Sequence, residues 1–177
     1  MIKKIKKTGR LLKNREAVYS VACVLLMIDQ LVKLLVRSKI SLMDEITVIP
    51  NFFSLYHIEN TGAAFSLFSG ATIILIVLSV LVLAFLHFYV LSDEVMTKWK
   101  KVGLGIVIGG IIGNLIDRIL YGAVVDYLAF SFVGYSFPVF NIADIGITVG
   151  FLILVIDIFR SDYNEFRDRS NRKWKKN

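Results

Sequence analysis

The stretch VGLGIVIGGIIGNLIDRIL, Val102 to Leu120, carries no charged residue before Asp117 and Arg118. An apolar run of about 20 residues is long enough for a helix to cross a lipid bilayer. The run is rich in glycine, and small residues on a membrane helix let neighbouring backbones approach closely. We therefore expect this stretch to form a membrane-spanning helix at the centre of a helix bundle.

Three further stretches have the length and composition of membrane spans, namely residues 17–36, 71–91 and 142–159. The whole 177-residue chain is 56% hydrophobic, which exceeds the usual share in soluble proteins. No repeat, linker or low-complexity stretch divides it. We expect a single integral membrane domain that covers residues 1–177.

The placement of charge predicts how the spans are oriented. The formal net charge is +7, and two thirds of all Lys and Arg lie in two tails, residues 1–15 and 160–177. Residues 92–101 are also rich in Lys, whereas residues 38–70 hold one Lys and residues 121–141 hold no Lys or Arg. The positive-inside rule then places both termini in the cytoplasm. Anionic phospholipids are the expected partner of the tails, and not nucleic acid, because each tail adjoins an apolar segment of membrane length.

The two outer connections have the composition of strands and of a membrane surface. Glu45 to Pro50 and Phe52 to Ile58 are rich in β-branched and aromatic residues, which favours short strands. Residues 121–140 hold six Phe or Tyr after Tyr121, and aromatic side chains prefer the membrane–water boundary. We expect an all-α membrane protein of four transmembrane helices with a small extracytoplasmic β-sheet on the outer membrane surface.

Two aspartates in the last third of the chain lie in apolar surroundings. Asp126 follows Ala123-Val124-Val125, and Asp144 directly precedes the fourth span. A carboxylate near the hydrocarbon boundary costs on the order of a few kcal/mol, so it is usually functional. Two such groups that meet could share one proton and activate water as an acid/base pair. The alternative for Asp144 is a helix cap, because Asn141 and Asp144 both lie at a helix start.

Polar residues of the other spans could surround this pair. Asn114 and Asp117 share a helix face, and we expect Asn114 to donate to a carboxylate or a substrate carbonyl. Asp117 and Arg118 are predicted to be interfacial anchors that build the site rather than react. Asp29 and Lys33, spaced i and i+4, form either a simple salt pair or a support that holds the outer site rigid.

The segment Glu59 to Phe65 combines Asn60 with small residues. It is either a turn that leads into a short helix or a place where the backbone approaches a ligand. His57 and His87 are far apart in the sequence and no Cys/His cluster exists, so we expect no metal and no cofactor.

Two other classes of protein remain open at this point. Intramembrane Asp, Arg and Asn residues also mark the ion paths of small transporters and proton-conducting proteins. A conduction path needs polar groups through the whole membrane, but the second span offers only His87 and the inner half of the third offers none. A non-catalytic membrane scaffold, whose polar residues only hold helices together, is the third possibility.

Five sequence blocks, in this order, resemble the bacterial lipoprotein signal peptidase family, also called signal peptidase II. The blocks are Asp29–Lys33, Asn60–Phe65, Gly109–Arg118, Val124–Tyr127 and Phe137–Asp144. The resemblance covers residues 20 to 160, and it does not explain the long basic tails.

The resemblance implies an aspartyl protease of the bacterial cell membrane with its site near the extracytoplasmic face. By position in the blocks, the catalytic pair is Asp126 and Asp144. Residues that contact substrate or inhibitor would be Asn60, Asn114, Arg118 and Asn141, and Asp29 and Asp117 would support them. The implied substrate is a prolipoprotein that carries diacylglycerol on a cysteine, with cleavage just before that cysteine. Globomycin-type cyclic peptides would inhibit the enzyme, and we expect a monomer.

Overall fold

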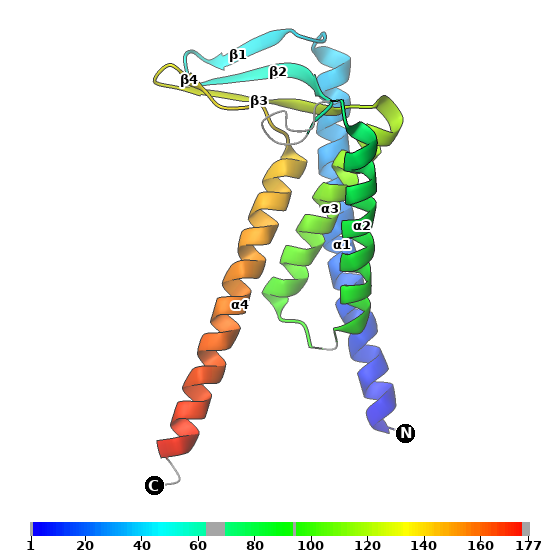
Figure 1. Cartoon of the computed structure of the whole chain (residues 1–177), viewed down its shortest axis with the longest axis vertical. Coiled ribbons are helices and arrows are strands. Elements are labelled where there is room, and N and C mark those ends of the chain that lie inside the picture. Colours follow the sequence, from blue (N-terminus) through cyan, green and yellow to red (C-terminus); the bar gives the residue numbers. More distant parts are fainter. Residues whose placement is uncertain (1, 63–69, 94, 175–177) are drawn as a thin grey trace.

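The computed structural model of the chain describes residues 2–62, 70–93 and 95–174. In these residues, four long helices stand below a four-stranded antiparallel sheet (Figure 1). The helices are α1 (Ile2–Lys39), α2 (Thr72–Ser92), α3 (Lys98–Tyr121) and α4 (Ile142–Trp174), and the strands are β1 (Glu45–Ile49), β2 (Phe53–Asn60), β3 (Val124–Phe132) and β4 (Tyr135–Ser136). Each helix contains a stretch long and apolar enough to cross a membrane, so the four predicted spans are confirmed as helices.

The glycine-rich helix α3 lies at the centre, as predicted. In its most apolar window 56% of the residues are buried inside the protein, against 11% for α2. Its glycines allow close contact on two sides. A Cβ added to Gly109 would lie 2.5 Å from the carbonyl oxygen of Ala22 on α1, and one added to Gly110 would lie 2.6 Å from that of Ala143 on α4. Both helices therefore pack against the bare backbone of α3.

The sheet has the strand order β1-β2-β3-β4 and lies across one end of the bundle (Figure 1). The two predicted strands, residues 45–50 and 52–58, correspond to β1 and β2. β2 runs antiparallel to β3 from the pair Phe53 and Phe130 to the pair Asn60 and Val124. The pairing brings Asn60 beside Val124 at the start of β3, although α2 and α3 separate the two strands in the sequence.

A short bridge between β3 and the residue before Asn141 places the start of α4. The backbone N–H of Leu128 donates to the carbonyl of Phe140 at 2.8 Å, and the N–H of Phe140 donates back to Leu128 at 3.2 Å. The first turn of α4 thus begins next to the buried strand residues Val125 and Asp126.

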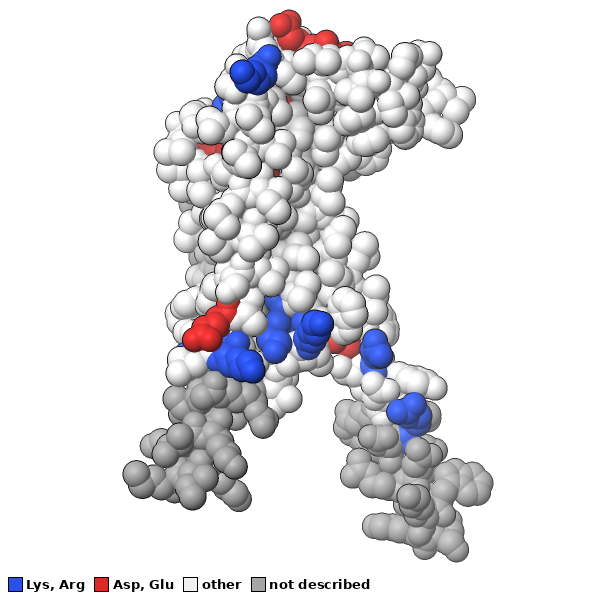
Figure 2. Space-filling model, turned by 180° about the vertical axis from the view of Figure 1, so that it is seen from behind, with Lys and Arg blue, Asp and Glu red and all other residues white. Residues whose placement is uncertain are grey.

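Helices α1 and α4 extend beyond the predicted spans into the basic tails. Lys and Arg are good helix formers and no proline interrupts either tail, so each helix continues past its apolar part. The first described turns of α1 and the last described turns of α4 lie at the end opposite the sheet and diverge (Figure 1). Figure 2 shows a broad belt without charged side chains between that end and the sheet.

Candidate active site

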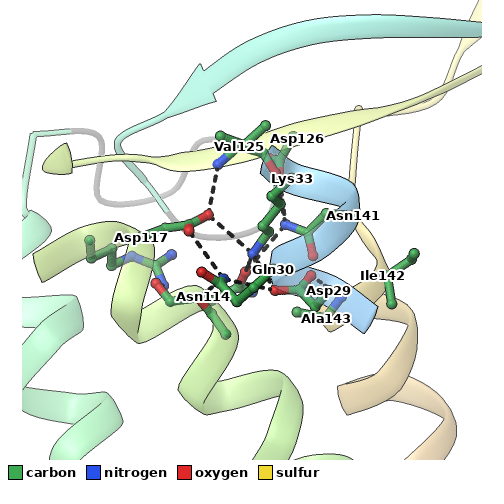
Figure 3. A network of polar contacts seen from close by, with 12 residues as sticks. Asp29, Gln30, Lys33, Asn114, Asp117, Val125, Asp126, Asn141, Ile142 and Ala143 are labelled. Carbon is green, nitrogen blue, oxygen red and sulfur yellow. Dashed lines mark hydrogen bonds and ion pairs between the residues drawn. The ribbon is translucent and has the colours of Figure 1, made fainter. Parts of the chain in front are cut away.

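The two predicted aspartates come together at the sheet end of the bundle, on either side of Asn141. Asp126, on β3, is only 2% exposed. The side-chain amide of Asn141 donates from Nδ2 to Oδ1 of Asp126 at 2.7 Å (Figure 3). The backbone N–H of the same residue donates to Oδ2 of Asp144 at 3.2 Å. One residue therefore contacts both carboxyl groups.

Asp144 is part of a helix cap, as the alternative interpretation held, but the cap leaves one of its oxygens for the site. Its backbone N–H donates to Oδ1 of Asn141 at 3.0 Å, which with the reciprocal bond makes a capping box. The other carboxyl oxygen, Oδ1, accepts from Nδ2 of Asn114 at 2.8 Å. The expectation that Asn114 donates to a carboxylate is thus confirmed.

Asn60 reaches the second aspartate from the end of β2. Its Nδ2 donates to Oδ2 of Asp126 at 2.9 Å, while its Oδ1 accepts from the backbone N–H of Gly62 at 2.9 Å. The bond between Asn60 and Gly62 forms a turn, which was one of the two interpretations of residues 59–65. The short helix expected after it falls on residues 63–69, which lie outside the described part of the chain.

A buried ion cluster lies directly beneath the pair. Lys33, 2% exposed, contacts Oδ2 of Asp29 at 2.9 Å and Oδ2 of Asp117 at 3.1 Å (Figure 3). The predicted i, i+4 salt pair is therefore present, and it has a second carboxylate. The Nζ of Lys33 also donates to Oδ1 of Asn114 at 2.8 Å.

Each carboxylate of this cluster also attaches a segment that carries the aspartate pair. Oδ1 of Asp29 accepts from the backbone N–H of Ala143 at 3.1 Å, in the first turn of α4. Oδ2 of Asp117 accepts from the N–H of Val125 at 3.2 Å, directly before Asp126. The ion cluster therefore ties α1 and α3 to the two segments that carry Asp126 and Asp144.

Gln30 is a site residue that the sequence analysis missed. Its Nε2 lies within hydrogen-bond distance of Oδ2 of Asp29 at 3.2 Å, the carbonyl of Gly113 at 3.2 Å and Oδ1 of Asp117 at 3.3 Å. The available signal was an amide next to Asp29 in an otherwise apolar span, where an unpaired amide is costly.

Arg118 contacts the Asn60 turn through a backbone carbonyl. Its Nη2 donates to the carbonyl of Gly62 at 3.0 Å, and its Nη1 donates to the carbonyl of Asn114 at 3.4 Å. Its Nε is buried and has no hydrogen-bond partner in the described part of the chain. Of the two predicted anchors, Asp117 is thus in the ion cluster and Arg118 lines the open site.

A cavity of about 720 Å³ opens over the pair. Its polar end is formed by Asn60, Asn114, Arg118, Asp126 and Asp144. Its apolar wall comes from residues 137–140 and from α4 residues 145 and 147–149. Such a site could hold a polar reacting group at one end and an apolar chain along the other.

The electrostatics of the site favour a shared proton. Burial, and then the nearby charge of Asp144, raise the pKa of Asp126 to about 7. Burial also raises the pKa of the neighbouring Tyr127 phenol, whose oxygen accepts from the N–H of Ile142 at 3.3 Å. Two close carboxyl groups in such a setting do not both ionise readily.

Comparison with known proteins places the chain in a family. A family model described as signal peptidase (SPase) II matches residues 21–160. The chain belongs to the signal peptidase II family. All the polar site residues described above lie within the matched range.

Individual relatives agree with the assignment to signal peptidase II. A lipoprotein signal peptidase of Maridesulfovibrio salexigens is 39% identical and covers 80% of this chain and 94% of its own length. One from Symbiobacterium thermophilum is 41% identical, with coverages of 77% and 90%. A solved bacterial membrane enzyme superposes with a TM-score of 0.76 at 29% identity and covers 83% of this chain and 90% of its own.

Proposed function

We propose that this protein is an aspartic endopeptidase that removes the signal peptide from diacylglyceryl-modified prolipoproteins, just before the lipid-modified cysteine. Membership of the signal peptidase II family supports the activity. The observation that carries the proposal is the contact of one residue, Asn141, with the carboxyl groups of both Asp126 and Asp144 at the polar end of a cavity. The transporter alternative is not favoured, because the family and the named relatives are peptidases.

The proposed mechanism uses the two carboxyl groups in different protonation states. The ionised one takes a proton from a water molecule, whose oxygen attacks the scissile carbonyl carbon. The protonated one donates to the carbonyl oxygen, and a proton then passes to the leaving amine. Asn114 and Asn141 orient the carboxyl groups, and Arg118, which lines the polar end of the cavity, orients the substrate.

The apolar wall of the cavity suits a substrate that is already in the bilayer. The wall on α4 continues below Asp144 as Ile145, Thr148 and Val149, and this helix is one of the four candidate spans. An apolar signal helix and acyl chains can lie along such a wall while the peptide bond reaches the polar end. This is the basis for proposing a lipid-modified substrate rather than a soluble one.

The proposal includes an orientation in the membrane. Both termini would be cytoplasmic, and the sheet would lie on the outer surface of the bacterial plasma membrane, with the site near that face. The chain would act as one domain and as a monomer, with anionic phospholipids at its basic tails and globomycin-type peptides as inhibitors. The support is the charge pattern, with 21 Lys and Arg of which two thirds lie in the tails.

Cleavage of a lipidated prolipoprotein by the purified protein tests the proposal. Asp126→Asn and Asp144→Asn should each abolish cleavage without a loss of fold, because either change removes one half of the acid/base pair. Asp93→Asn, the same chemical change beyond the far end of α2, should keep the parental rate. Parental cleavage by either site variant would refute the pair, and equal turnover of an unlipidated substrate would refute the proposed specificity.

A further inference from the structure

Three asparagine amides point their NH₂ groups at the aspartate pair, and each is oriented by a donor on its carbonyl oxygen. In Asn60 and Asn141 that donor is a backbone N–H from the same local turn. In Asn114 the nearer donor is the buried ammonium of Lys33, from a different helix, at 2.8 Å, and Nδ2 of Asn141 lies at 3.3 Å from the same oxygen. A side-chain amide with a donor on its oxygen must turn its nitrogen to the other side. The cation on α1 therefore sets which end of Asn114 faces Asp144.

We infer that Lys33 is a positioning residue that acts through Asn114 to keep Asp144 ionised, which leaves the shared proton of the pair on Asp126. The inference deepens the proposed function and rests on it only for the reaction that the pair performs. It gives Asp126 and Asp144 different roles, which the sequence alone does not distinguish.

The surroundings of Asp144 favour its charged form in three ways. It accepts from Asn114, whose amide is polarised by a cation on its oxygen, and such chains of hydrogen bonds strengthen one another. It accepts from the backbone N–H of Asn141. It also lies in the first turn of α4, where the helix dipole stabilises an anion.

Asp126 has none of these three advantages among the contacts of the described residues. It lies on a strand, away from a helix start, and its oxygens accept from the neutral amides of Asn60 and Asn141. Both of these amides are oriented by backbone N–H groups and neither by a cation. When one proton must be shared, it resides on the group whose charged form is less stabilised.

The other charges near the pair do not reverse this order. Arg118 on α3 acts on both Asp126 and Asp144. Asp29 on α1 and Asp117 on α3 are like charges, but each pairs with Lys33 at 2.9 Å and 3.1 Å. The Asp126 pKa of about 7, which burial and the charge of Asp144 raise, is in line with a proton on Asp126.

The assignment determines the direction of each proton transfer. Asp144 takes a proton from water as the new C–O bond forms, and Asp126 gives its proton to the carbonyl oxygen, which becomes a hydroxyl. As the C–N bond breaks, Asp144 passes its proton to the leaving nitrogen and the hydroxyl proton returns to Asp126. The pair ends in its starting state, and one water has been consumed.

Infrared spectroscopy tests the location of the proton without any substrate. The carbonyl stretch of a protonated aspartic acid is followed from pH 5 to 9 in the parental protein and in Asp126→Asn. We expect a band that titrates near pH 7 and is lost in Asp126→Asn. A band that persists in Asp126→Asn, or its absence from the parental protein, overturns the assignment. Because no cleavage is measured, this result is separate from failure of the proposed function.

The role of Lys33 is tested with a double variant that keeps the net charge of the ion cluster at its parental value. Asp29→Asn/Lys33→Met removes one negative and one positive charge, and Asp29→Asn alone is its control. The acidic limb of the cleavage–pH profile should move up by about one pH unit or more in the double variant relative to the control. Adding back the cation, as Asp29→Asn/Lys33→Arg, should reverse most of that shift. A profile that matches the control contradicts the inference.

A second variant covers the case in which the double variant does not fold. Asn114→Ala keeps the ion cluster and removes its contact with Asp144. It should move the same acidic limb upwards, and thermal unfolding in detergent shows whether the fold is kept. A lower rate with an unchanged profile would mean a structural role only and would also overturn the inference.

Discussion

Helices α2 and α3 follow one another in the chain and both can cross a membrane, but their surroundings are opposite. In α2 only 11% of the most apolar window is buried in the protein, whereas in α3 the share is 56%. α2 carries no Asp, Glu, Lys or Arg, and α3 carries the glycines and the site residues Asn114, Asp117 and Arg118. The less apolar helix is the one at the centre.

The reason is that lipid tails are as apolar as leucine. Apolar residues gain little when they leave lipid for protein, so the association of membrane helices depends on close packing of small residues and on polar contacts. In this chain Gly109 allows the close packing and Asn114 makes the polar contact. The comparison predicts that equal changes in α2 and α3 have unequal effects.

The largest difference should come from removing one polar group in each helix. Asn114→Ala removes the donor to Asp144 and the acceptor of Lys33, so cleavage should fall about 100-fold or more, by analogy with the loss of one preorganised donor. Ser79→Ala on α2 removes only a bond to the carbonyl of Leu75 in its own helix and should leave the rate unchanged. Steady-state cleavage of a lipidated prolipoprotein compares them. Similar cleavage rates for the two variants would contradict the predicted difference between α2 and α3.

The buried carboxyl beside α3 should make stability fall as pH rises. Asp126 keeps its proton in the folded protein up to a pKa of about 7, whereas an unfolded Asp ionises near 4. Between these values unfolding releases a proton, so the free energy of unfolding decreases from pH 4 to pH 7, by up to about 4 kcal/mol. Thermal unfolding in detergent across this range measures the slope. Asp126→Asn should flatten it, and an unchanged slope in that variant would refute the assignment.

Adding volume to a small residue gives the next contrast. Gly109→Ala places a Cβ 2.5 Å from the carbonyl oxygen of Ala22, and overpacking of this kind costs about 1–3 kcal/mol. Ala84→Leu adds more volume on an exposed face of α2 and should change stability by less than about 0.5 kcal/mol. Thermal unfolding of both variants in the same detergent is the measurement. An equal decrease would show that α3 is not more tightly packed than α2.

The smallest effect is expected just beyond the C-terminus of α2. Burial alone would raise the pKa of Asp93, but hydrogen bonds from Lys100 and the N–H of Val95 outweigh it and hold the pKa below its usual value. This carboxyl therefore adds stability at neutral pH that is lost as pH falls below 4, the opposite sign to Asp126. The two side chains are only partly buried and solvent still screens their charges, so Asp93→Asn should lower stability by a few tenths of a kcal/mol. Thermal unfolding should show a larger difference between the two proteins at pH 7 than at pH 3.

Much of the fold could be predicted because the signals are local. A run such as Val102 to Leu120 can satisfy its backbone in a bilayer only as a helix, and β-branched residues at 45–49 favour a strand wherever they lie. The ends of α1 and α4 were less well predicted. The membrane boundary limits the apolar run, but it does not end a helix that good helix formers continue.

The sequence predicted which residues belong to the candidate site better than it predicted the contacts between them. Asp126, Asp144 and Asn114 stood out because polar groups are costly in apolar surroundings. Gln30 was missed, and Lys33 was assigned only a partner on its own helix. Their further contacts with Asp117 and Asn114 span 81 to 87 residues of sequence, and no local pattern specifies them.

The amino-acid sequence alone therefore determines that the chain spans a membrane, which segments form the four helices and the first two strands, and which polar residues need partners. The tertiary structure determines which residues become those partners. The register of β2 on β3 and the packing of α1 and α4 on the glycines of α3 bring Asn60, Lys33 and Asn141 to one point. The physical reason is that the preference of a segment for lipid, water or a polar partner follows from its own residues. Hydrogen-bond geometry depends instead on the distances between segments, and only tertiary packing sets those distances.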